Sequence, residues 1–133
     1  MNQRNQNILI SIITPSYNGA KTICRAMESI LCQEYPFIQY IIMDNESSDG
    51  TKEIVEEYSP RFAARGIDFK FFSEKDEGLY DAVNKGIARA DGEIVSYLCV
   101  DDEYTQDAFN IVVEQYKKSP FDYMFSSIIL ENE

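Results

Sequence analysis

The amino-acid sequence predicts an α/β protein with a mainly parallel, doubly wound sheet and helices on both of its faces. Apolar runs of strand length alternate along the chain with amphipathic stretches of roughly ten to fifteen residues, which is the pattern of βαβ units. The chain has 133 residues, the size of one ordinary domain, and neither a repeat nor a low-complexity linker divides it. We therefore expect a single domain over residues 1–133.

The first strand and the first helix have clear boundaries in the sequence. The run Ile8–Thr14 is almost continuously apolar and β-branched, which indicates a strand covered on both faces, and Pro15 ends it. Asn18 and Gly19 then form a turn, with Asn18 as the expected N-cap of a helix that Pro36 ends. The apolar face of this helix consists of Ile23, Met27, Ile30 and Leu31.

The middle of the chain repeats this alternation. Tyr40–Met43 is expected as the second strand, and the polar stretch 45–50 after it is a loop. Asp49 or Ser48 is suited to cap the next helix. The third strand is expected at Ile67–Phe72. The apolar face of the helix between these strands consists of Ile54, Val55 and Tyr58.

The last part of the chain contains the strongest helix signal. From Gly78 to Ala90 the apolar residues follow helical spacing throughout, and Asp91-Gly92 is the expected left-handed cap. Ile94–Val100 is the most hydrophobic predicted strand. A further helix is expected at Thr105–Lys118, with two lysines at the negative end of its dipole, and a last strand at Phe121–Leu130.

Composition excludes several classes of function. The chain has 12 basic and 23 acidic residues, so its net charge of −11 repels nucleic acids and excludes them as partners. It has no histidine, which excludes an imidazole base or a histidine-bound metal within this chain. No long apolar run follows the polar residues 1–7, so we expect neither a secretory signal nor a membrane span. Its three cysteines lie in apolar contexts and are expected to be buried, which favours a cytoplasmic location.

Three polar clusters come at the carboxyl ends of predicted strands. Thr14–Asn18 follow the first strand, Asp44 follows the second, and Asp101 and Asp102 follow the strand Ile94–Val100. In a parallel sheet these ends meet at one edge, where ligands of such folds bind. The sequence therefore predicts a ligand site at this edge.

The acidic pair Asp101-Asp102, with Glu103 behind it, points to a metal. Adjacent like charges cost free energy unless a cation compensates them, and no basic residue lies nearby in the sequence. An all-oxygen site selects Mg²⁺ or Mn²⁺, and Mg²⁺ completes its shell with substrate phosphates and water. The alternative is that these acids cap the next helix or face solvent, since acidic turns are common.

Residues next to the first two strand ends are suited to bind a nucleoside. The ring of Tyr17 can stack on a base, Asp44 can accept a hydrogen bond from a ribose hydroxyl or a base N–H, and Asn45 offers a donor and an acceptor. Ordinary turn formation and a buried aromatic ring are the competing interpretations. On local grounds, turn formation is slightly favoured for Asp44.

The glycines indicate no phosphate-binding loop. Neither G-x-x-x-x-G-K-[ST] nor G-x-G-x-x-G occurs, so bound phosphates would have to be neutralised by another means, such as a metal on Asp101 and Asp102. Gly86 lies inside a predicted helix, where it costs about 1 kcal/mol relative to Ala. Tight packing of helix on sheet is the favoured reason for it.

Four segments, in order and spacing, resemble family 2 glycosyltransferases. They are I-S-I-I-T-P-S-Y-N, M-D-N-E-S-S-D-G-T, S-E-K-D-E-G-L-Y-D-A-V-N-K-G-I and Y-L-C-V-D-D. The resemblance covers almost the whole chain and implies the GT-A fold, a nucleotide-binding α/β sheet. It also implies that the C-terminal, acceptor-binding part of the family is missing from residues 1–133.

The resemblance implies a role for particular residues. Those assigned to the nucleotide sugar are Pro15, Tyr17, Asp44, Asn45, Asp76, Asp81, Asn84, Lys85 and Asp101. Asp102 is assigned to the Mg²⁺ or Mn²⁺ ion, and Asp101 to ribose or metal. Cys99 stands where the family motif usually has its first Asp, and Asn45 stands where the family often has a second Asp.

The same resemblance implies an inverting transfer of sugar from a nucleotide donor to a glycan or lipid-linked acceptor, in polysaccharide or glycan synthesis. The general base is expected beyond residue 133, so no catalytic residue is assigned. Self-association and a peripheral place at the inner face of the membrane are further expectations.

Two other activities remain open, and one class is excluded. A donor-binding domain that is catalytically incomplete fits the same residues. A nucleotidyltransferase is a more distant alternative, because the loop after the first strand has Lys21 as its only cation. A phosphoacceptor signalling domain of flavodoxin-like type requires acids directly after its first strand, and this chain has none there.

Overall fold

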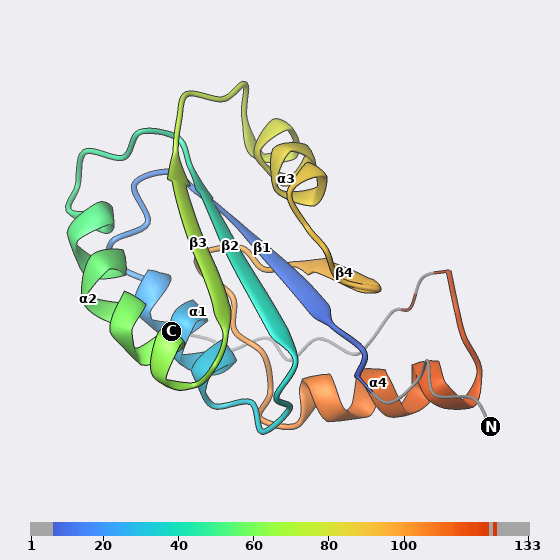
Figure 1. Cartoon of the computed structure of the whole chain (residues 1–133). Coiled ribbons are helices and arrows are strands. Elements are labelled where there is room, and N and C mark those ends of the chain that lie inside the picture. The colour runs from blue at the N-terminus through green and yellow to red at the C-terminus, as the bar shows by residue number, and fades with distance from the viewer. Residues whose placement is uncertain (1–6, 123, 125–133) are drawn as a thin grey trace, which may run out of the picture.

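The structure is a computed structural model that describes residues 7–122 and 124. Within this part of the chain, one sheet of four parallel strands has the order β3-β2-β1-β4 (Figure 1). The strands are β1 (Ile10–Ser16), β2 (Ile38–Asp44), β3 (Asp68–Ser73) and β4 (Ile94–Tyr97). The helices are α1 (Ile23–Leu31), α2 (Thr51–Ala64), α3 (Leu79–Ala88) and α4 (Ala108–Lys118). The predicted α/β class and parallel sheet are confirmed.

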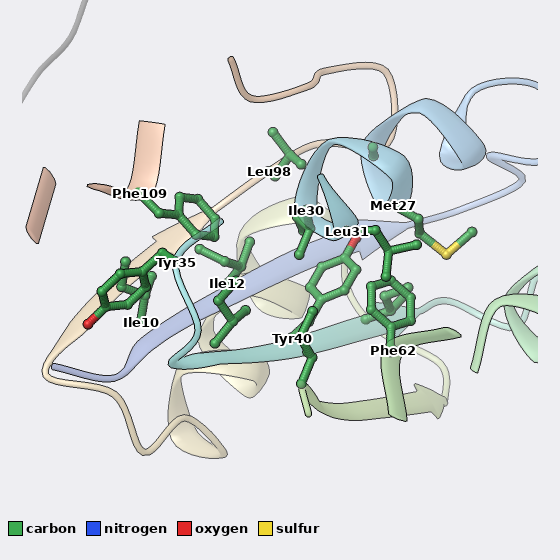
Figure 2. Packing of buried hydrophobic residues seen from close by; sticks show 14 of the residues in the cluster. Ile10, Ile12, Met27, Ile30, Leu31, Tyr35, Tyr40, Phe62, Leu98 and Phe109 are labelled. Carbon is green, nitrogen blue, oxygen red and sulfur yellow. The ribbon is translucent and has the colours of Figure 1, made fainter. Parts of the chain in front are cut away.

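The two faces of the sheet carry different amounts of covering structure. Alternate residues of the central strands point to opposite faces. On one face, Ile12 and Tyr40 belong to the larger core together with residues of α1, α2 and α4. Figure 2 shows part of this core, in which the rings of Tyr40 and Phe62 lie 5.4 Å apart at an interplanar angle of 62°. On the other face, Ile13 and Ala82 join β1 to α3 in a smaller cluster.

The sheet has buried central strands and partly exposed edges. Every residue of β1 and β2 is buried, as the apolar run Ile8–Thr14 predicts for a strand covered on both faces. By contrast β4, expected as part of a buried strand, is an edge strand among the described residues, and its Val95 and Tyr97 are exposed. The hydrophobicity of this segment therefore does not reflect burial on both faces.

Gly86 marks the tightest contact between α3 and the sheet. A Cβ atom at this position would lie 2.5 Å from Cγ2 and 2.7 Å from Cγ1 of Ile13, a side chain that is fully buried. The favoured interpretation of Gly86, close helix–sheet packing, is therefore confirmed.

Several predicted boundaries are wrong, and the reasons are tertiary. The fourth strand ends at Tyr97 rather than Val100, because the chain then enters a turn closed by the hydrogen bond from the Asp102 N–H to the Cys99 carbonyl, in which Val100 packs against Gly19. Asn18 is not the cap of α1, which has Thr22 as its N-cap. Asn18 instead has a φ of 50° and accepts a hydrogen bond from the Ser48 N–H.

The expected cap at Asp91-Gly92 is also wrong. Helix α3 ends at Ala88, and Arg89 at its C-cap has right-handed geometry. Asp91 instead exchanges hydrogen bonds with the buried Gln39 side chain, at 2.9 and 3.0 Å. Gly92 lies so close to β1 that a Cβ would come within 2.6 Å of Ser11 Oγ.

Other expectations concern cysteines and segments at the end of the chain. Cys32 is exposed and Cys24 and Cys99 are half-buried, so the prediction of buried cysteines is wrong, and none of the three is in a disulfide. No helix within residues 7–122 is both long and apolar enough to cross a membrane. The strand expected at 121–130 lies almost entirely outside the described residues.

Candidate functional site

A cavity opens at the carboxyl ends of the strands, where the strand order reverses. The chain moves outward from β1 to β2 and β3, then returns to place β4 on the other side of β1 (Figure 1). Such a reversal leaves a crevice in which α/β proteins bind ligands. The cavity measures about 820 Å³. Its wall is formed by residues 15–19, 21, 22, 45, 49, 76, 78, 79, 82 and 99–101.

The loops after β1 and β2 are held together by a reciprocal set of hydrogen bonds. The Asn18 N–H donates to Ser47 Oγ at 2.8 Å, and the Ser48 N–H donates back to Asn18 Oδ1 at 2.9 Å. The Ala20 N–H donates to Asp49 Oδ2 at 3.0 Å. These bonds fix one wall of the cavity without using the Tyr17 ring, which is 65% exposed.

Asp49 stabilises the start of α2 as well as this wall. Hydrogen bonds from the Thr51 hydroxyl and the Ala20 N–H hold the pKa of its carboxyl below the usual range. The residue at the N-cap of α2 is Gly50, which has a φ of 93° and no side chain to offer. Asp49, one residue before the N-cap, instead accepts a hydrogen bond from the Thr51 N–H at 3.2 Å.

Asp44 is buried beneath the loop that follows it. Its carboxylate accepts hydrogen bonds from the Ser47 N–H at 2.9 Å, the Ser47 hydroxyl at 2.6 Å and the Ser73 hydroxyl at 3.2 Å. It is 1% exposed and is not part of the cavity wall among the described residues. The side chain therefore supports Ser47, which in turn holds Asn18.

Asn45 connects the loop after β2 to the loop after β3. Its Oδ1 accepts a hydrogen bond from the Asp76 N–H at 3.0 Å. Asp76 Oδ1 accepts in turn from the Gly78 N–H at 2.8 Å, and Gly78 has a φ of 122°, in the region that favours glycine. The loop that enters α3 is thereby fixed against the end of β2.

Helix α3 carries a pair of opposite charges, Asp81 in its first turn and Lys85 in its last turn. Asp81 accepts a hydrogen bond from the Glu77 N–H at 2.9 Å and pairs with Lys85 at 3.2 Å. Both contacts hold the pKa of the Asp81 carboxyl below its usual range, with the backbone hydrogen bond as the larger cause. Asp81, Lys85 and the exposed Asn84 are outside the cavity wall as far as the structure describes it.

The two aspartates of the turn after β4 differ in their relation to the cavity. Asp101 lies in the cavity wall, whereas Asp102 follows it in a turn closed by a hydrogen bond from its N–H to the Cys99 carbonyl at 3.0 Å. Glu103 pairs with Arg25 at 2.8 Å. For Asp101 and Asp102, no ion pair occurs with any residue that the structure describes.

The residues present can supply two carboxylates to a cation, but not a complete ligand set. No group of three or more acidic or cysteine side chains within the described residues is arranged to hold a metal. Burial and the nearby charges of Asp102 and Asp101 raise the pKa of the Cys99 thiol, which lies next to this turn. Two exposed carboxylates without a counter-charge fit a Mg²⁺ or Mn²⁺ ion that takes its remaining ligands from phosphate and water.

The cavity brings together some of the residues assigned from the sequence and leaves others outside. Pro15, Tyr17, Asn45, Asp76 and Asp101 lie in its wall. The assigned residues outside it are Asp44, Asp81, Asn84, Lys85 and Asp102.

The sequence analysis missed other residues of this wall. Lys21 and Asp49 carry charge there, and Ser16 places a buried hydroxyl that lacks a hydrogen-bond partner among the described residues. The position of Lys21 and Asp49 in the loops after β1 and β2 was the only available signal for these two residues, whereas Ser16, the last residue of β1, belongs to the predicted polar cluster Thr14–Asn18.

The chain belongs to glycosyltransferase family 2. The model of that family, described as "Glycosyl transferase family 2", matches residues 11–133. A putative teichuronic acid biosynthesis glycosyltransferase, TuaG of Bacillus subtilis, is 36% identical over 102 residues, which are 74% of this chain and 38% of that protein. A poly-beta-1,6-N-acetyl-D-glucosamine synthase of Staphylococcus epidermidis is 36% identical over 112 residues, which are 84% of this chain and 26% of that protein. The chain thus spans less than two fifths of either relative.

Solved structures show the same fold. Staphylococcus aureus TarS 1–349 in complex with UDP-GlcNAc matches with a TM-score of 0.76 and 23% identity, over 84% of this chain and 32% of that one. The mannosyltransferase PcManGT from Pyrobaculum calidifontis, in complex with GDP-Man and Mn²⁺, matches with a TM-score of 0.73 and 24% identity, over 83% of this chain and 32% of that one. The expected GT-A fold is confirmed.

Proposed function

We propose that this chain is the donor-binding part of an inverting, metal-assisted glycosyltransferase. Its donor is a nucleoside-diphosphate sugar, and its acceptor is a glycan or lipid-linked hydroxyl in the synthesis of a polysaccharide or related glycan. The observation that carries this proposal is the cavity at the switch point of the sheet, which places Tyr17, Asn45 and Asp101 in one wall. Relatives that make polysaccharides, and TarS with its UDP-GlcNAc, support the choice of ligand.

Each part of the donor has a suitable partner in this geometry. The exposed ring of Tyr17 offers a stacking surface for the base. The Asn45 side chain, fixed through its Oδ1, offers hydrogen bonding at the base edge. Lys21 is the one cation among the described wall residues, beside Asp49, Asp76 and Asp101. With so little positive charge from the protein, a diphosphate needs another source of neutralisation.

Asp101 and Asp102 would hold a divalent ion against the diphosphate. When bound, such an ion stabilises the negative charge that develops on the leaving nucleoside diphosphate. PcManGT with its GDP-Man and Mn²⁺ supports this choice of cofactor. We assign no general base within residues 1–133.

The test is a calorimetric titration of the protein with nucleoside diphosphates, carried out with and without Mn²⁺. Wild type should bind more tightly with Mn²⁺, and Asp102→Ala should lose this dependence on metal. Glu114→Ala is the matched control, because it removes the same charge from an exposed position on α4. Binding that is unaffected by both Mn²⁺ and the Asp102 substitution would refute the metal assignment. Absence of any nucleotide binding would refute the proposed function as a whole.

A further inference from the structure

The two aspartates proposed to hold the ion lie in the middle of an irregular segment. Residues 98–107, between the end of β4 and the start of α4, form neither helix nor strand. Asp101 and Asp102 therefore have no regular element of their own to fix them. Their position depends on the contacts that hold this segment before and after them.

Before the aspartates, the segment is held by the sheet and by the loop after β1. The Leu98 N–H donates to the Ile13 carbonyl at 2.8 Å, one residue after β4 ends. Val100 packs so closely on Gly19 that a Cβ atom at Gly19 would lie 3.1 Å from the Val100 side chain. The approach to the aspartates is thus fixed by β1 and its loop.

After the aspartates, the segment is held by the Gln33 side chain, which follows α1. Its Nε2 donates to the Thr105 carbonyl at 2.8 Å, and its Oε1 accepts from the Phe109 N–H at 3.2 Å. A backbone carbonyl can only accept and a backbone N–H can only donate, so the orientation of this amide is determined. The N-cap of α4, Asp107, makes no side-chain capping bond, so Gln33 satisfies a first-turn N–H of α4 in its place.

Gln33 is itself held rigidly. It is 1% exposed, and its Nε2 also donates to the Ser29 carbonyl at 3.0 Å. Its own carbonyl accepts a hydrogen bond from Arg65 Nη2 of α2 at 2.6 Å. A buried amide bonded in this way is costly to displace, because its partners would lose their hydrogen bonds inside the protein.

Other contacts of the same segment involve only the tips of side chains. The pair of Glu103 and Arg25 is about half exposed, so water screens much of its attraction. The hydroxyl groups of Tyr104 and Ser96 share one hydrogen bond at 2.9 Å. Gln33, by contrast, binds two main-chain groups, and it therefore fixes the course of the backbone after the aspartates.

We propose that Gln33 is a positioning residue of the metal site. By holding the backbone at Thr105 and Phe109, it keeps Asp101 and Asp102 in the arrangement that a divalent ion can use, although Gln33 itself touches neither the ion nor the nucleotide. Groups that orient metal ligands from outside change metal affinity by about 10–100-fold when they are replaced. This inference rests on the proposed function, because it requires an ion on these two aspartates.

The substitution Gln33→Met tests the proposal, because it keeps an unbranched side chain of similar length but removes the donor and the acceptor. Calorimetric titrations with UDP and GDP, with and without Mn²⁺, give the ratio of the two affinities for the nucleotide that wild type binds more tightly. Circular dichroism confirms that each variant is folded under these conditions. A loss of overall stability alone would not change this ratio in the folded protein.

Gln39→Met is the matched control. Gln39 is also fully buried, and its side chain bonds to Ser11, Asp68 and Asp91. It lies near the start of β2, at the opposite end of the strand from the site. Its replacement should cost stability, while the ratio of affinities stays at the wild-type value.

The expected result is a selective loss of metal dependence. In Gln33→Met the affinity with Mn²⁺ should fall roughly tenfold, and the affinity without Mn²⁺ should not change. A wild-type ratio in Gln33→Met, or an equal fall in Gln39→Met, would overturn the inference while the proposed function stood. If Gln33→Met does not fold, Gln33→Asn decides in the same way, because its shorter side chain keeps the amide but draws it back from Thr105. If wild type itself binds no more tightly with Mn²⁺, the metal assignment fails, and the inference fails with it.

Discussion

Replacement of Gly86 by Ala should destabilise the protein, although Ala is the better helix former. The new Cβ would lie 2.5 Å from Ile13 Cγ2, where carbon atoms normally approach to about 3.5–4.0 Å. Ile13 is fully buried in a cluster with Ile41, Met43 and Ala82, so it can move aside only by displacing packed neighbours. Overpacking of this kind costs about 1–3 kcal/mol, and helix propensity returns about 1 kcal/mol. We therefore expect a net loss of up to about 2 kcal/mol in the free energy of unfolding.

The assay for this prediction is urea unfolding followed by far-ultraviolet circular dichroism. The midpoint should fall at an unchanged slope, which identifies a change in stability rather than in the denatured state. The double variant Ile13→Ala, Gly86→Ala provides the control, because Ile13→Ala removes the two nearest of the three Ile13 carbon atoms that the new Cβ would meet and leaves only Ile13 Cβ, at 3.2 Å. The destabilisation of the double variant should then be smaller than the sum of the single effects. A more stable Gly86→Ala protein, or additive effects within about 0.5 kcal/mol, would refute the packing argument.

Two further predictions follow from buried and paired charges. Asp44→Ala removes the acceptor of three hydrogen bonds, so the free energy of unfolding in urea should fall by about 2–4 kcal/mol and nucleotide binding should weaken with it. An unchanged urea midpoint would contradict this support of Ser47. Arg61 donates a hydrogen bond to Glu28, which holds the pKa of the Glu28 carboxyl below its usual range. The pair therefore contributes its full stability above the unfolded-state pKa of about 4.3. This contribution is lost as the pH falls through the lower pKa that Glu28 has in the folded state. Arg61→Gln should therefore flatten the plot of urea midpoint against pH below about pH 4.3, and the same slope in both proteins would exclude the pair as its cause.

Local sequence patterns predicted where the residues of the candidate site lie in the sheet, but not their surroundings. Asp44 follows a clear apolar strand, so its place at the carboxyl edge of the sheet could be predicted. Its burial could not, because the two serines that surround it come from the next loop and from β3. Asp101 and Asp102 were likewise placed at the correct edge. Only the turn after Tyr97 decided that Asp101 enters the cavity wall and that Asp102 lies beside it.

The sequence alone determined the succession of strands and helices, the parallel sheet and the edge at which polar residues gather. These features depend on the spacing of apolar residues and on the Gly, Pro and polar residues that end helices and strands, both of which are local properties. Tertiary structure decided that β4 lies beside β1, that α3 packs through Gly86 against Ile13, and that the Asn45 side chain accepts a hydrogen bond from the Asp76 N–H. Each of these depends on partners distant in sequence, such as Asp76, 31 positions from Asn45. Periodicity shows which face of an element is apolar, but not which other element will cover it.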